Sequence, residues 1–80
     1  MDPVIKLIVQ ARVMFLFDEP EIGKLVTQLK PREVDDDICV ETDGKSLFYN
    51  RENIKQATRD ELMDRMRVLA PFVEVEPHEK

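Results

Sequence analysis

The stretch Ile38-Cys-Val-Glu-Thr-Asp-Gly-Lys-Ser-Leu-Phe-Tyr-Asn50 decides how the rest of this 80-residue chain is interpreted. It places Asp43-Gly44 between two runs rich in β-branched and aromatic residues, a pattern typical of a β-hairpin. Both turn residues can adopt the positive φ that a two-residue type I′ turn requires, Gly44 without steric cost. We therefore predict a hairpin whose tip is Asp43-Gly44.

A two-residue turn fixes which residues of the two strands face one another. The predicted pairs are Thr42–Lys45, Glu41–Ser46, Val40–Leu47, Cys39–Phe48 and Ile38–Tyr49. Because side chains alternate along a strand, one face of the hairpin carries an apolar set, namely Ile38, Val40, Leu47 and Tyr49. The other face carries Cys39, Glu41, Ser46 and Phe48. The apolar face needs a cover, and the flanking segments have helical patterns that can supply it.

Two helices are predicted before the hairpin. The first covers Val4–Phe17, and its buried stripe is Val4, Ile8, Ala11 and Phe15. The second follows Asp18-Glu-Pro-Glu21, where Asp18 is the predicted cap and Pro20 lies in the first turn. Its apolar stripe is Ile22, Leu25, Val26 and Leu29. Gly23 inside this helix indicates that another element approaches closely there, and Pro31 ends the helix.

Two more helices and a strand are predicted after the hairpin. Asn50 is a good N-cap for a short helical turn over 51–56, and Thr58-Arg-Asp-Glu61 is a capping box that opens a helix over 59–69. Pro71 ends that helix. Residues 72–76 alternate well enough for a short third strand, with Val73 and Val75 facing inward.

These elements predict an α+β fold. We expect two layers, with about three to four helices packed on a small antiparallel β-hairpin or sheet. A chain of 80 residues forms one domain, 1–80, in which 76–80 are predicted to be a frayed tail.

The composition argues against several classes of protein. The net charge is −5 and the isoelectric point is near 4.8, whereas a nucleic-acid surface needs clustered Lys and Arg. No apolar run approaches the roughly 18–20 residues that span a bilayer. The chain begins Met-Asp-Pro, without the layout of a secretory signal, and its one cysteine cannot form an internal disulfide. We therefore predict a cytoplasmic protein that binds neither nucleic acid nor membranes.

The side chains that carry catalysis are scarce. The single histidine, His78, lies near the end of the chain, and Cys39 is the single cysteine, so neither a nucleophile–base pair nor a zinc site is indicated. With two glycines, no phosphate-binding loop is indicated. Asp35-Asp36-Asp37 lacks the ligand spacing of a calcium loop and is interpreted as solvated. We therefore predict that the protein is not an enzyme and has no cofactor.

Three segments resemble a known family. They are Ala11-Arg-Val-Met-Phe-Leu-Phe-Asp-Glu-Pro-Glu-Ile-Gly-Lys-Leu25, Thr42-Asp-Gly-Lys-Ser-Leu-Phe-Tyr-Asn50 and Asp60-Glu-Leu62. Together they are similar to the N-terminal part of a bacterial and phage family of zinc metallopeptidases with a von Willebrand-type companion domain. In that family a Thr-Asp-Gly-x-x-Leu-Tyr-Tyr-Asn hairpin precedes a helix that runs into His-Glu-x-x-His. The resemblance implies a metallopeptidase-like scaffold.

This chain departs from the family where the metal would bind. Counting on from Leu62, the His-Glu-x-x-His positions fall on Val68, Leu69 and Phe72, which are not zinc ligands, and Pro71 interrupts the helix. The resemblance therefore implies a scaffold without its zinc site.

Three hypotheses about function follow. The first is a bacterial or phage protein that binds a protein partner or forms a homodimer; its predicted contact residues are Ile5, Ile8, Arg12, Phe15, Phe48 and Tyr49. Core packing is the alternative role for each of them, and the favoured one for Ile8 and Phe15. The second is an acidic inhibitor or DNA mimic that presents Asp35, Asp36 and Asp37 to a basic partner. The third is a residual metal-binding hydrolase domain with ligands such as Asp35, Asp37, Glu74 or His78.

Overall fold

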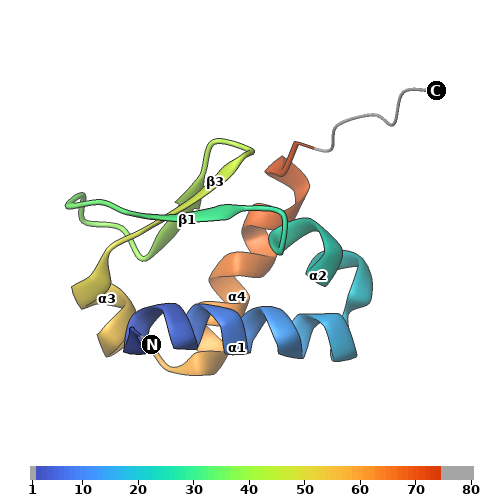
Figure 1. Ribbon diagram of the computed structural model, residues 1–80, viewed down its shortest axis with the longest axis horizontal. Helices are drawn as coiled ribbons and strands as arrows, with labels where there is room; N and C mark the ends of the chain where they lie inside the picture. The colour runs from blue at the N-terminus through green and yellow to red at the C-terminus, as the bar shows by residue number, and fades with distance from the viewer. Residues whose placement is uncertain (1, 75–80) are drawn as a thin grey trace.

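The computed structural model of the protein describes residues 2–74. Within them four α-helices pack on a small three-stranded sheet, which confirms the predicted α+β class (Figure 1). The elements are α1 (Pro3–Asp18), α2 (Pro20–Val26), β1 (Lys30–Glu33), β2 (Val40–Thr42), β3 (Ser46–Tyr49), α3 (Arg51–Gln56), α4 (Arg59–Leu69) and a 3-10 helix, η1 (Ala70–Phe72). Helix α1 packs against α2, α3 and α4, and α4 also contacts β2.

Helix α1 supplies one side of the hydrophobic core. Asp2 caps it by accepting a hydrogen bond from the backbone N–H of Val4, and Pro3 occupies the first position, where its missing N–H has no intrahelical partner to lose. The predicted buried stripe is confirmed: Val4, Ile8, Ala11 and Phe15 are all inaccessible to solvent. The rest of the core is Val26, Leu29, Val40, Leu47, Tyr49, Ile54, Leu62, Met63, Met66, Ala70 and Val73.

Helix α2 begins and ends differently from the prediction. Asp18 was predicted to cap it but is the last residue of α1, and the N-cap of α2 is Glu19, whose side chain makes no capping bond. The helix ends at Val26, after which the backbone tightens: the N–H groups of Gln28 and Leu29 donate to carbonyl oxygens three residues back instead of four. Helices commonly end in such a tighter last turn. Leu29 is nevertheless buried, from the turn that follows the helix.

The close approach predicted at Gly23 is confirmed. A Cβ atom at this position would lie 2.8 Å from the backbone nitrogen of Leu16 and 2.9 Å from its Cα. Both are backbone atoms of α1, so they cannot swing aside as a flexible side chain would. The glycine therefore sets how closely α2 packs on the C-terminal half of α1.

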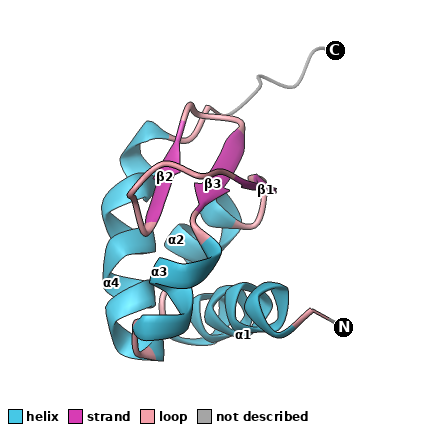
Figure 2. Cartoon of the chain, turned by 90° about the vertical axis from the view of Figure 1, so that its left-hand side faces the viewer, coloured by secondary structure: helices cyan, strands magenta, loops and turns pink. Residues whose placement is uncertain are grey.

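Strand β1 was not predicted, since the second helix was expected to continue to Pro31. Because of β1 the sheet is mixed and not purely antiparallel as predicted. The strand pairs in parallel with β3, with Lys30 opposite Ser46 and Glu33 opposite Tyr49. All four of its residues are exposed, so the segment shows no alternation of apolar and polar residues that would indicate a strand. The strand order β1-β3-β2 places it at an edge, where Pro31 is tolerated (Figure 2).

The predicted hairpin forms, but its register was wrong by two residues. Thr42 lies opposite Leu47 rather than Lys45, and Val40 lies opposite Tyr49 rather than Leu47. A shift of two residues keeps each side chain on its predicted face. Accordingly Val40, Leu47 and Tyr49 are buried, as predicted for the apolar face.

The turn is longer than predicted because two side chains stabilise it locally. The carboxylate of Asp43 accepts hydrogen bonds from the backbone N–H groups of Lys45 and Ser46, and the hydroxyl of Thr42 accepts one from Gly44. These bonds form a wider loop in place of a type I′ turn. In residues 2–74 only Gly44 has a positive φ, 99°, so Asp43 does not take the conformation that the two-residue turn required.

Replacing Gly44 by Val tests this turn. The positive φ is strained for any residue with a Cβ, so we expect the free energy of unfolding to fall by about 1–2 kcal/mol. The added Cβ would also lie 2.7 Å from Cγ of Glu74, but that is the flexible part of a side chain and can move. Urea unfolding followed by circular dichroism measures the change; an unaltered midpoint would contradict the turn geometry.

The C-terminal helices follow the prediction, and the last strand does not. Asn50 caps α3, and Thr58 and Glu61 form the predicted capping box of α4, which spans the predicted residues. Residues 70–72, however, form η1, because the helical path continues for one tighter turn around Pro71. Val73 is buried, as predicted, although it lies in no strand. The remaining residues of the predicted third strand, 75 and 76, and the predicted tail lie outside the described residues.

Candidate functional site

Helix α1 has a second apolar face, which points away from the core. Four large apolar side chains on it are exposed: Val9 at 38%, Val13 at 44%, Leu16 at 44% and Phe17 at 81% of their full surface. We call these four residues the outer α1 face. In Figure 1, α1 forms the lower edge of the molecule.

The outer α1 face follows a helical spacing that the sequence already contained. Counted from Val9, the residues Val13, Leu16 and Phe17 lie at positions i+4, i+7 and i+8. Apolar residues at these positions share one face of an α-helix. The buried stripe Val4, Ile8, Ala11, Phe15 fits the same template on the opposite side. A helix with two such stripes is apolar nearly all round, and the stripe predicted to face the core is the one that does.

The six predicted contact residues are not brought together on one surface. Ile8, Phe15 and Tyr49 lie in the core, exposed by 0%, 0% and 5%, which corresponds to the core-packing alternative. Ile5 is half-buried against the core. Arg12 is half-buried and donates from Nη2 to the carbonyl oxygen of Leu29. Phe48 is partly exposed, on the face of the hairpin opposite Leu47.

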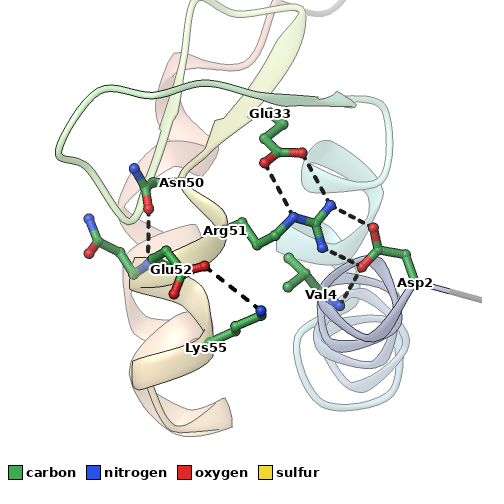
Figure 3. A network of polar contacts seen from close by, with 8 residues as sticks. Asp2, Val4, Glu33, Asn50, Arg51, Glu52 and Lys55 are labelled. Carbon is green, nitrogen blue, oxygen red and sulfur yellow. Dashed lines mark hydrogen bonds and ion pairs between the residues drawn. The ribbon is translucent and has the colours of Figure 1, made fainter.

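A network of charged side chains ties the N-terminus to the sheet and to α3 (Figure 3). Arg51 donates two hydrogen bonds to Asp2, at 2.7 and 2.6 Å, and two to Glu33, at 3.2 and 3.1 Å. Two-pronged contacts of this kind match the planar guanidinium to the carboxylates. The three residues come from the cap of α1, from β1 and from α3, so the network joins three elements that are distant in the sequence.

The hydrogen bonds from Arg51 make the stability of the fold depend on pH. The pKa of the Asp2 carboxyl lies far below its ordinary range. The main cause is the pair of hydrogen bonds from Arg51, and the hydrogen bond from the N–H of Val4 is the second. In the unfolded chain an Asp carboxyl has a pKa of about 3.9. Because the pKa of Asp2 is lower in the folded protein, its hydrogen bonds stabilise the fold fully above about pH 3.9. This stabilisation is lost as the pH falls toward the pKa of the folded state. We expect Asp2→Asn, which preserves the cap, to lower the melting temperature at neutral pH.

The difference in melting temperature between wild type and Asp2→Asn should then shrink as the pH falls below about 4. Thermal unfolding followed by circular dichroism from pH 7 to pH 2.5 measures it. The matched control is Asp35→Asn, which alters an exposed loop carboxylate. A difference that stays constant across this range would mean that the Asp2 carboxylate is not the stabilising group.

A second charged cluster joins α4 to the end of α1. Arg67 donates to both carboxylate oxygens of Glu19, with a shortest distance of 2.6 Å, and also pairs with Asp64 on its own helix. Its guanidinium carbon lies 5.5 Å from the centre of the Phe15 ring, within the range of a cation–π contact. Arg67 therefore has a structural role, which holds α4 against the α1–α2 corner.

A polar cavity of about 340 Å³ opens between the hairpin and the helices that follow it. It is lined by Asp37, Cys39, Asn53, Gln56, Ala57, Glu61 and Arg65. Burial raises the pKa of the Cys39 thiol, which disfavours the reactive thiolate. The amide of Asn53 is already used, because it donates to Asp37 and to the carbonyl oxygen of Ile38. Among the lining residues, the Cys39 thiol is thus not activated and the Asn53 amide is already bonded within the fold.

The acidic loop does not gather into a metal site. Asp35, Asp36 and Asp37 are exposed, and Asp37 accepts a hydrogen bond from Asn53. In the part of the chain that the structure describes, no three His, Cys, Asp or Glu side chains are close enough together to hold a metal ion. Of the ligands suggested for the hydrolase alternative, Glu74 is exposed and His78 lies outside the described residues.

Comparison with known proteins adds no assignment. No protein-family model matches the chain, and neither a curated protein nor a solved structure matches it. The resemblance to the metallopeptidase family therefore stays a prediction. Among residues 2–74, no helix is long and apolar enough to cross a membrane.

Proposed function

We propose that the protein is a small, non-enzymatic binding protein that docks on a protein partner through the outer α1 face. The observation that carries this proposal is the exposure of Val9, Val13, Leu16 and Phe17 on one side of a helix whose other side is core. Scattered apolar side chains on a surface need no explanation, but these four share one face of a helix and so lie near one another. Such patches are typical of protein–protein contacts.

Phe17 is the anchor of the proposed contact. It is the most exposed large apolar residue in the described chain, at 81%. Aromatic side chains at the centre of an interface contribute much of its binding energy, because they combine a large area with little conformational entropy. Fully burying a side chain of this size is worth about 1.5–3 kcal/mol. The three aliphatic neighbours extend the contact along about two turns of the helix.

The charged and polar groups support a non-enzymatic role. Arg51 and Arg67 are both used to join elements of the fold, and Thr58 and Glu61 cap α4. In this proposal the scaffold is metallopeptidase-like, of bacterial or phage type and cytoplasmic. The hairpin of β2 and β3 precedes α4, with α3 between them, and the resemblance implies a hairpin that precedes a helix.

Photo-crosslinking from α1 tests the proposal. A benzoylphenylalanine in place of Phe17 should form adducts with a protein in cells that express the chain, because the position is exposed on the proposed contact surface. The matched control carries the same group at Phe72, which is exposed by 67% but lies on η1. Adducts from position 17 and none from 72 are the expected result. No adducts from position 17, or equal yields from both positions, would overturn the proposal.

A further inference from the structure

We infer that Asp43-Gly44 is a latent site of isoaspartate formation, a covalent rearrangement of the backbone that the folded turn prevents and an opened turn permits. These residues are the one Asp-Gly pair in the sequence. They lie in the turn between β2 and β3 and not on the outer α1 face, so this modification is independent of the proposed function.

The rearrangement needs no reactant besides the two residues and water. The backbone nitrogen of Gly44 attacks Cγ of Asp43, and a cyclic imide closes. One water molecule leaves, formed from the carboxyl hydroxyl group and the proton of the attacking N–H group. Water then adds back to one of the two carbonyl carbons of the ring. Addition at Cγ restores aspartate, whereas addition at the backbone carbonyl carbon leaves the main chain running through the side chain, which is isoaspartate.

The folded turn holds the attacking nitrogen. The N–H group of Gly44 donates to the hydroxyl of Thr42 at 2.9 Å, and that hydroxyl donates in turn to the carbonyl oxygen of Ser46 at 2.6 Å. The carbonyl oxygen of Gly44 accepts a hydrogen bond from the backbone N–H of Glu74 at 2.8 Å. Ring closure removes the proton from the Gly44 nitrogen, so it has to break the bond to Thr42 first.

The folded turn also holds the carboxyl group that would be attacked. Oδ1 of Asp43 accepts hydrogen bonds from the backbone N–H groups of Lys45 at 2.9 Å and Ser46 at 2.8 Å. These bonds favour the ionised form and hold the pKa of the Asp43 carboxyl below its ordinary value. The ionised form reacts poorly, because the protonated carboxyl loses its hydroxyl as water far more easily. Both reacting groups are therefore bound within the turn.

The pair is nevertheless reactive once the turn opens. Glycine has no Cβ that would hinder the attack of its nitrogen. Asp43 is exposed, so water reaches the ring that forms. Opening the turn frees the Gly44 nitrogen and returns the pKa of Asp43 to its ordinary value of about 3.9. The rate of isomerisation thus reports how often the turn opens.

An isomerised turn does not close again in the same form. Isoaspartate adds the Cβ atom of residue 43 to the main chain, and the free carboxylate is then attached to Cα. The bonds to Lys45 and Ser46 are lost in their present geometry. Because the turn sets the register of a hairpin, the pairing of β2 with β3 weakens. The modification therefore marks chains whose hairpin has opened.

Mass spectrometry of the full chain during a long incubation at neutral pH tests the inference. Isomerisation leaves the mass unchanged, so electron-transfer fragmentation identifies isoaspartate at position 43. In urea, where the turn is open, isoaspartate should accumulate. In the folded chain its formation should be slower by about tenfold or more, because the reaction must wait for local opening. Equal rates in the folded and the unfolded chain would overturn the inference.

Two substitutions of Thr42 test the hydrogen bond to Gly44. Thr42→Val keeps the shape of the side chain but removes the hydroxyl, and it should raise the rate in the folded chain by about tenfold. The matched control, Thr42→Ser, keeps the hydroxyl and should isomerise at the wild-type rate. In urea all three chains should react equally fast, since the bond is absent there.

Circular dichroism checks that both variants fold. If the folded Val and Ser variants isomerise at the same rate, the hydroxyl of Thr42 does not protect the site and the inference is overturned. The comparison of folded with unfolded wild type decides the matter if Thr42→Val does not fold.

Discussion

Phe15→Ala is expected to destabilise the fold by about 3–5 kcal/mol, whereas Phe17→Ala, two residues away on the same helix, should change stability by less than about 0.5 kcal/mol. Phe15 is a fully buried core residue, and the guanidinium of Arg67 lies over its ring. Its removal leaves a cavity that the surrounding side chains fill only in part. Phe17 is 81% exposed and loses little by truncation.

Urea unfolding of the two variants, followed by circular dichroism, measures this contrast. The loss at Phe15 is a large fraction of the stability of an 80-residue domain, so this variant has a low midpoint or is unfolded without denaturant. If the two variants lost equal stability, α1 would not have one core face and one outer face. That result would remove the basis of the proposed contact.

Gly23→Val is the second large effect, with an expected loss of about 3 kcal/mol. The new Cβ would lie within 3 Å of backbone atoms of Leu16, so α2 must move away from α1 to accommodate it. Replacing glycine inside a helix by a residue with a side chain usually stabilises the helix, so the sign of the effect is informative. Thermal unfolding followed by circular dichroism measures it.

The control for Gly23 is Lys24→Val, which introduces the same β-branched side chain at the next position of α2, where the residue is exposed. Its expected effect is within about 0.5 kcal/mol, as for other surface substitutions. A Gly23→Val variant as stable as this control would mean that the two helices are farther apart than the structure places them.

The sequence predicted the elements that are specified locally. The capping box Thr58–Glu61 and the N-cap Asn50 fix the starts of α4 and α3, because a cap needs only residues within one turn. The buried stripe of α1 was found for a similar reason, since its helical period is regular over the whole helix. The faces of the hairpin followed from alternation, and they survived an error of two residues in the register.

The errors in the predicted strands and turn have physical causes that a sequence pattern does not reveal. Strand β1 has no buried side chain, so only its pairing with β3 makes it a strand, and that pairing is a contact between residues about 16 positions apart. The turn after β2 was misassigned because the side chains of Thr42 and Asp43 stabilise a wider loop than Asp-Gly alone suggests.

The outer α1 face was missed because α1 is apolar nearly all round. The predicted contact residues were drawn partly from the stripe that became core, Ile8 and Phe15 among them. The buried stripe itself was predicted correctly, and the spacing of Val9, Val13, Leu16 and Phe17 is also present in the sequence. Whether apolar residues outside the core stripe are exposed depends on where the neighbouring helices pack, and that is a property of the tertiary fold.

The most direct test of the central claim, that α1 turns one face to the core and the other to a partner, is hydroxyl-radical footprinting of three phenylalanines in the purified chain and in an extract of cells that express it. We expect Phe15 to be unreactive throughout, because it is buried, and Phe72 to be reactive throughout. Phe17 should be reactive in the purified chain and protected in the extract, where the partner is present. Reactivity of Phe17 that stays equal to that of Phe72 in both samples, or a reactive Phe15, would contradict the account.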